Sequence, residues 1–281
     1  MQSGADARAA ERRPRSLGLS LGWATDVAVL EHTGSTVDDR GDHLVVRTPH
    51  NPTFHWGNCV LVTDPEALDD AERWMHVFRT AFPAADWVAI GLERMPSDAA
   101  AWHRHDVELE LEDVLATRTL PRQTALAPGY TVRRLVGEDW EQMIALEMAE
   151  NERTAEWNPE SYEPFARARM RAHRSLSDRG AGAFFGAFAD GVLVARLGIV
   201  RCGTTARYQN VGTDAEHRRR GLASHLLGVA ARWAADQGCD SWVILTEATN
   251  PAGRVYRSVG FDVHGTNVQA YRRRLAQRER G

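Results

Sequence analysis

The 281-residue sequence contains no long apolar segment, because no uninterrupted apolar run approaches the roughly 20 residues that a membrane-spanning helix needs. The first eighteen residues are rich in Ala and Arg and lack the apolar centre of a secretory signal peptide. They also carry Asp6 and Glu11, whereas organelle transit peptides are poor in acidic residues. We therefore expect residues 1–18 to be a disordered tail, and we expect no membrane partner.

Cysteine is scarce in this sequence. The three cysteines, Cys59, Cys202 and Cys239, lie far apart and never in the Cys-x-x-Cys spacing of redox or zinc sites. The histidines likewise form no cluster of the zinc-binding type. We expect reduced, buried or half-buried thiols in a cytoplasmic protein, and no metal site.

Neither sign of charge dominates, since 34 Lys and Arg residues stand against 38 Asp and Glu residues and the formal net charge is −4. This balance gives no general case for nucleic-acid binding, and the basic run at 271–274 is typical of a solvated terminus. A hydrophobic content of 43% and a charged content of 26% are typical of a globular protein. A chain of 281 residues is long enough for two domains that each bury a core.

The first half of the chain alternates predicted strands and helices. Asp64-Pro65 is a typical helix start, and apolar residues follow it at helical spacing as far as Phe82. Short apolar runs bounded by turn residues predict strands. The predicted strands are at 44–48, 59–62, 87–92 and 107–111, with a short helix at 97–103.

Pro121, Pro128 and Gly129 indicate a linker at 119–129. Beyond it, Asp190-Gly191 lies between two apolar runs and predicts a hairpin turn, so the second half begins as a mostly antiparallel sheet and is not doubly wound. Predicted strands are at 130–135, 183–189, 192–201, 206–213, 242–245 and from 261; predicted helices are at 140–150, 162–176, 221–237 and from 250.

The segment 211–223 has the features of an anion-binding site. A strand ends near Thr213 and a helix begins at about Gly221, so unpaired N–H groups lie beside the positive end of a helix. Gly221 and Ala223 leave the main chain open to a pyrophosphate, and the arginines at 218–220 add positive charge. A nucleotide phosphate loop has more glycine and a Lys followed by Ser or Thr, so the ligand is not expected to be ATP.

Arg218, Gly221 and Ala223 resemble the pyrophosphate motif Gln/Arg-x-x-Gly-x-Gly/Ala of the GNAT superfamily of N-acetyltransferases. The preceding Val211-Gly212-Thr213 is similar to the family's Val-x-Val/Thr strand end. About thirty residues later, the segment 250–261 keeps the Asn, Tyr and Gly-Phe of a second family signature, but has Gly253 where Ala is usual. The resemblance covers residues 129–275.

The resemblance implies an α/β fold of GNAT type, with a mixed, largely antiparallel central sheet flanked by helices. It implies acetyl-CoA as co-substrate and no metal. The acceptor would be the primary amine of a small molecule, or the N-terminus or a lysine of a peptide or protein, and the enzyme would be a monomer or homodimer. The residues implied to bind acetyl-CoA are Val211, Gly212, Thr213, Arg218, Arg219, Arg220, Gly221, Leu222, Ala223, Ser224, Asn250 and Tyr256.

Acetyl transfer needs a proton donor for the departing thiolate and a base for the amine. The resemblance implies that Tyr256 is the donor, although it also fits a core aromatic on a short helix, and Asn250 also fits a helix N-cap. Glu247, at a strand end, is the predicted base. Glu147 and Glu150 are weaker candidates because helix carboxylates are usually solvated, and water can also serve. A non-catalytic acyl-CoA-binding regulatory or scaffold protein is the alternative function.

The two halves share one order of predicted elements: strand, helix, strand, short helix, strand. The segment from Trp87 to His105 has the same succession of predicted elements, a strand and then a short helix, as the segment from Trp242 to Gly260. This similarity predicts a weak internal repeat. Residues 40–115 would then be half of a degenerate GNAT-like unit without the acyl-CoA loop, or else an unrelated α/β domain. The loop 51–58 would line an acceptor pocket or form a satellite core. The predicted organisation is a tail at 1–18, an N-terminal domain at 19–118, a linker at 119–129 and a GNAT domain at 130–281.

Overall fold

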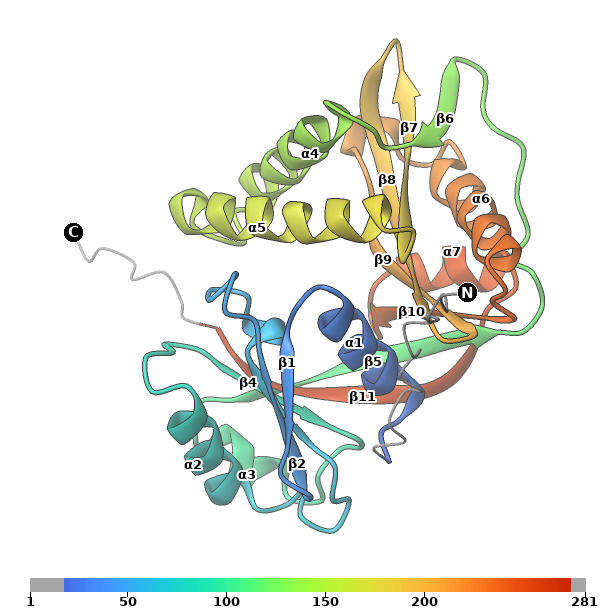
Figure 1. Ribbon diagram of the computed structural model, residues 1–281. Helices are drawn as coiled ribbons and strands as arrows, with labels where there is room; N and C mark the ends of the chain where they lie inside the picture. Colours follow the sequence, from blue (N-terminus) through green and yellow to red (C-terminus); the bar gives the residue numbers. More distant parts are fainter. Residues whose placement is uncertain (1–17, 274–281) are drawn as a thin grey trace, which may run out of the picture.

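The computed structural model describes residues 18–273, so nearly all of the predicted tail at 1–18 lies outside the described residues. One sheet of eleven strands runs through the molecule in the order β1-β2-β3-β4-β11-β5-β10-β9-β8-β7-β6 (Figure 1). Its strands are β1 (Thr36–Asp39), β2 (His43–Arg47), β3 (Cys59–Val62), β4 (Val88–Leu92), β5 (Glu108–Thr117), β6 (Tyr130–Arg134), β7 (Gly182–Ala189), β8 (Val192–Cys202), β9 (Thr205–Thr213), β10 (Ser241–Glu247) and β11 (Asp262–Arg272).

Seven helices accompany this sheet over residues 18–273. Two neighbouring strand pairs, β3–β4 and β9–β10, are parallel, and the other pairs are antiparallel, which confirms the predicted fold class of a mixed, largely antiparallel sheet flanked by helices. The helices are α1 (Leu21–His32), α2 (Ala71–Ala81), α3 (Ala99–His103), α4 (Asp139–Thr154), α5 (Pro159–Asp178), α6 (Leu222–Asp236) and α7 (Ala252–Ser258), with short 3-10 turns at His55–Gly57 and Ala215–His217.

The apolar core of the C-terminal half is divided by the sheet. Helices α4 and α5 bury Trp140, Met143 and Met170 against one face, together with Val29 of α1. Helices α6 and α7 bury residues such as Leu226 and Tyr256 in a separate cluster. Helix α1 contacts β8, β9 and β10 as well as β1 and β11, so it lies where the two halves of the chain meet (Figure 1).

The predicted repeat of elements is confirmed in order, because β3-α2-β4-α3-β5 matches β9-α6-β10-α7-β11. Each half also places its last strand inside the other half. Strand β5 pairs with β10 and β11, while β11 pairs with β4 and β5. Strands of the two halves therefore alternate at the centre of the sheet, in the order β4-β11-β5-β10. The domain limits at 19–118 and 130–281 stay a prediction.

One predicted helix start is wrong. Helix α2 begins at Ala71 and not at Asp64-Pro65, because Asp70 caps it by accepting a hydrogen bond from the Arg73 N–H at 3.1 Å. The Asp64 carboxylate instead accepts from the Glu66 N–H at 3.0 Å and holds a local turn. Asp and Asn are favoured at turns as well as at helix starts, so the sequence offered two capping positions.

The sequence pattern also missed α1 and β1. Helix α1 has no single apolar face, because Trp23, Val27 and Leu30 pack in the core of the N-terminal half while Val29 packs against α4 and α5. A helix buried on two sides lacks the one-sided periodicity by which amphipathic helices are predicted. Its position between the halves nevertheless makes α1 part of the wall of a cavity between them.

The three cysteines are unpaired, with Cys59 and Cys239 buried and Cys202 half-buried. Within residues 18–273, no three His, Cys, Asp or Glu side chains are grouped so that they could hold a metal ion. No helix in the same range is long and apolar enough to cross a membrane.

Candidate active site

Strands β9 and β10 pair in parallel over three residues and then separate. The last pair is Arg207 with Val243. Beyond it, β9 bulges: its register against β8 shifts between Arg196 and Gly198, and Asn210 adopts a left-handed φ of +50°. The edge of β9 that faces β10 is unpaired beyond Arg207 within the described residues, so residues 211–213 offer main-chain groups to a ligand between the two strands.

The predicted phosphate loop folds as an open turn at the start of α6. Arg219 and Gly221 have left-handed φ values of +60° and +76°, and a Cβ added to Gly221 would meet no atom within 4 Å. No side chain caps α6, and its first N–H groups, at residues 222–224, have no partner within the helix. The side chains of Arg218, Arg219 and Arg220 are exposed beside them. This arrangement suits a pyrophosphate.

Tyr256 lies on α7 with its ring buried in the core cluster that also contains Val259 and Phe261. Burial raises the pKa of Tyr256 to about 12, although the nearby charge of Arg207 opposes the rise. The phenol is therefore protonated at neutral pH and able to donate a proton. Asn250 precedes the helix, and its side-chain oxygen accepts a hydrogen bond from the Ala252 N–H at 2.9 Å.

Glu247 is exposed at the end of β10, directly opposite Glu112 of β5 in the strand register. Burial raises the pKa of Glu112 to about 7, and the carboxylates of Asp26 and Glu247 add to the rise. Glu112 was not among the predicted site residues because the predicted strand ended at residue 111. The alternation of glutamates at 108, 110 and 112 was the available signal.

A cavity of about 250 Å³ lies between the two halves, and we refer to it as the interhalf pocket. The sequence left two roles open for the loop 51–58, a pocket wall or a satellite core. Asn51, Phe54 and Trp56 line this cavity, and Phe54 and Trp56 also pack against the core of the N-terminal half. Helix α1, helix α5 and the sheet complete the wall. Other lining residues include Trp23, Asp26, Glu112, Arg169, His173, Arg207, Gln209, Asn210 and Gln269.

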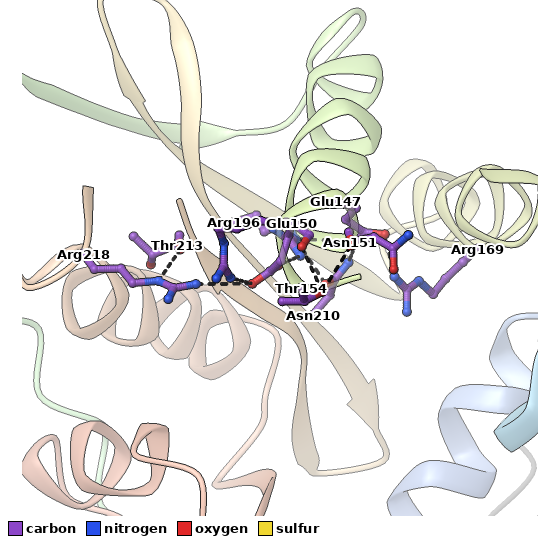
Figure 2. A network of polar contacts seen from close by, with 10 residues as sticks. Glu147, Glu150, Asn151, Thr154, Arg169, Arg196, Asn210, Thr213 and Arg218 are labelled. Carbon is purple, nitrogen blue, oxygen red and sulfur yellow. Dashed lines mark hydrogen bonds and ion pairs between the residues drawn. The ribbon is translucent and has the colours of Figure 1, made fainter. Parts of the chain in front are cut away.

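Glu147 is 1% exposed, so the expectation that it lies on a solvated helix face is wrong. Its carboxylate contacts Arg169 of α5 at 2.5 Å, Arg196 of β8 at 3.5 Å and the amide nitrogen of Asn210 (Figure 2). Burial raises the pKa of Glu147, but the Arg169 and Arg196 charges outweigh burial and lower the pKa below its ordinary value. Glu147 thereby fixes the β9 bulge through Asn210 and is a positioning residue.

Glu150 extends this network to the phosphate loop. It contacts Arg196 at 3.0 Å and Arg218 at 3.4 Å, and the Arg218 Nε donates to the Thr213 carbonyl at 3.0 Å (Figure 2). Both helix glutamates are therefore bound to arginines, which removes them as free bases. The network joins the bulge of β9 to the loop before α6.

Residues 140–261 match the Acetyltransferase (GNAT) family. A GCN5-related N-acetyltransferase from Kribbella flavida superposes with a TM-score of 0.63 at 16% identity, over 89% of this chain and 95% of that one. A tandem GNAT protein from the clavulanic acid biosynthesis pathway gives 0.53 at 13% identity, over 87% of both chains. No curated protein matches the sequence. Because the tandem protein covers both halves, its fold favours the degenerate GNAT-like interpretation of residues 40–115.

Proposed function

We propose that the GNAT-family acetyltransferase domain of this chain, which includes residues 140–261, transfers an acetyl group from acetyl-CoA to an amine bound between the halves. The observation that carries the proposal is the convergence of three features: the unpaired edge of β9 beyond Arg207, the open loop at Gly221 and the Tyr256 hydroxyl near Arg207. A thioester held between β9 and β10 would have a proton donor beside it.

The proposed binding residues for acetyl-CoA follow this geometry. The main chain of Val211, Gly212 and Thr213 would pair with the pantetheine arm at the free edge of β9. The loop from Arg218 to Ser224 would hold the pyrophosphate through N–H groups and arginine side chains. Bound acetyl-CoA supplies the activated acetyl carbon as a thioester.

The reaction breaks the carbon–sulfur bond of the thioester and forms a carbon–nitrogen bond. Tyr256 would give its phenolic proton to the departing thiolate. Because the phenol is neutral, Tyr256 needs no change in protonation before this step. The β9 bulge at Asn210, held by Glu147, would orient the main chain toward the reacting carbonyl.

Calorimetry of the full chain with CoA tests the binding site. We expect Gly221→Glu to weaken CoA binding by at least about tenfold, because it places bulk and negative charge where the pyrophosphate would lie. Gly203→Glu is the matched control, since Gly203 is also left-handed, at φ +67°, has open space around it and lies in the β8–β9 turn. Absence of CoA binding to the wild type at millimolar ligand would refute the proposal, and binding without thiol release for any amine would support the scaffold alternative.

The same titration should give one CoA per chain. The N-terminal counterpart of the phosphate loop, between β3 and α2, has no Arg-x-x-Gly-x-Ala and instead contains Asp64, Glu66, Asp69 and Asp70. These carboxylates would repel a pyrophosphate. We propose that this half shapes the acceptor side, and a measured ratio of two CoA per chain would contradict that role.

A further inference from the structure

Glu112 occupies a central position in the sheet. It lies opposite Glu247 on β10 and opposite Asn267 on β11. Directly opposite residues in an antiparallel pair point to the same face, with Cβ atoms about 5 Å apart. The two carboxylates are therefore neighbours, although they come from different halves of the chain.

Glu112 also lies level with the proposed thioester site. Strands β9 and β10 are parallel, and their last pair is Arg207 with Val243. Four residues farther along, β9 reaches Val211 at the bulge and β10 reaches Glu247. Because Glu112 is opposite Glu247, its carboxylate lies one strand from the gap in which the thioester would be held.

Within the described part of the chain, no cation that faces Glu112 is free to pair with it. Asp26 of α1, Arg207 of β9, Glu247 of β10 and Gln269 of β11 face it. Arg207 is already bound, because it contacts Asp26 at 2.7 Å and donates to the Tyr208 carbonyl at 2.9 Å. Over residues 18–273, neither Glu112 nor its neighbour Glu247 forms an ion pair, and Glu112 lines the interhalf pocket, so the pocket contains a carboxylate that a cationic ligand would satisfy.

A second feature of the pocket indicates a ligand with a further polar group. His173 of α5 lines the cavity, is 4% exposed, and its Nδ1 has no hydrogen-bond partner within the described chain. Buried polar atoms are normally paired, so an unpaired one at a cavity wall is a contact available to a ligand. Trp23, Phe54 and Trp56 supply apolar walls. The volume of about 250 Å³ fits a small molecule and not a folded protein surface.

We propose that the interhalf pocket binds a small primary amine and that Glu112, contributed by the N-terminal half, holds the ammonium group and accepts its proton. This inference rests on the proposed acetyl transfer. The ammonium N–H bond breaks and its proton moves to the Glu112 carboxylate. The freed lone pair then forms the bond to the acetyl carbon, and the carbon–sulfur bond breaks. Tyr256 protonates the thiolate, and the second proton that the nitrogen loses returns through solvent to the Tyr256 oxygen, which restores the phenol.

The test compares wild type, Glu112→Gln and the control Glu108→Gln, which changes an exposed carboxylate on the same strand. The probes are 2-phenylethylamine, tyramine, histamine, the neutral analogue 2-phenylethanol and a lysine-containing tetrapeptide. Calorimetry in the presence of CoA measures probe binding, and thiol release from acetyl-CoA measures turnover. Glu112→Gln keeps the size of the side chain and leaves the CoA site unchanged, so CoA affinity should equal that of the wild type.

We expect Glu112→Gln to lower kcat/KM for the accepted small amine by at least about tenfold, while Glu108→Gln has little effect. The wild-type kcat/KM should rise with pH through about 7, as Glu112 loses its proton, and this rise should be absent in Glu112→Gln. The variant should also bind the amine more weakly, but bind 2-phenylethanol as the wild type does.

Equal amine binding and equal pH profiles in the variant and the wild type would overturn the inference, as would turnover of the tetrapeptide alone. Failure of the proposed function is distinct, because it would appear as no thiol release by the wild type with any acceptor. In that case amine binding still decides: weaker binding to Glu112→Gln supports the amine site, and unchanged or undetectable binding overturns it.

Discussion

Tyr256→Phe is expected to lower kcat by about ten- to a thousandfold while leaving CoA affinity nearly unchanged. Phe keeps the ring that packs with Val259 and Phe261 and removes only the hydroxyl. Over residues 18–273, no protein group hydrogen-bonds that hydroxyl, so its loss breaks no contact that stabilises the fold. The effect should therefore appear in the chemical step with any accepted amine.

Tyr271→Phe is the matched control for this substitution. The Tyr271 hydroxyl contacts the His55 ring nitrogen at 2.7 Å, away from the phosphate loop. Its removal should cost about 1 kcal/mol of stability and leave kcat unchanged. If Tyr256→Phe matches the wild type under conditions where chemistry limits the rate, Tyr256 is a core aromatic, and another group or solvent protonates the thiolate.

Glu147→Ala is expected to lower the free energy of unfolding by about 3–5 kcal/mol, because it leaves two arginines in the interior without their shared carboxylate. Arg196 is 6% exposed, and Arg169 has a further buried nitrogen without a partner. Chemical denaturation at pH 7 measures the effect. Glu141→Ala, on the same helix, removes a carboxylate whose side chain is 69% exposed and should change stability by no more than about 0.5 kcal/mol.

The pH dependence of stability gives an independent check on Glu147. Its folded-state pKa is lowered from the ordinary value of 4.5, so its ion pairs stabilise the fold above that pH. This contribution is lost as the pH falls through the lowered pKa. The difference in stability between wild type and Glu147→Ala should thus shrink in acid, and a difference that is small at pH 7 would refute the assigned role.

Local patterns predicted the parts of the site that depend on neighbouring residues. The loop 218–223 and helix α7, which follows Asn250, each form within a short segment, so local sequence was informative about their conformation. Glu112 could not be predicted in the same way. Its environment depends on β10 and β11, which lie far along the chain, and on α1, whose two-sided burial hides it from periodicity.

The charge partners of Glu147 could not be predicted for a related reason. On its own helix it shares the face of the buried Trp140 and Ile144, but its arginine partners come from α5 and β8. A sequence pattern records which side chains share a face, but not which distant charges meet that face. The sequence therefore identified the element that carries Glu147 and missed the role of its side chain.

The exchange of β5 and β11 also determines when the N-terminal half can be completed during synthesis. Strand β4 receives its second neighbour only from β11, which is the last described strand. A nascent chain would therefore expose an unpaired edge of β4 until residues 262–272 have been synthesised, and unpaired edges promote association with other chains. A truncation that removes β11 would take a central strand out of the first half, so damage to a late segment of the chain would destabilise the part of the protein that is made first.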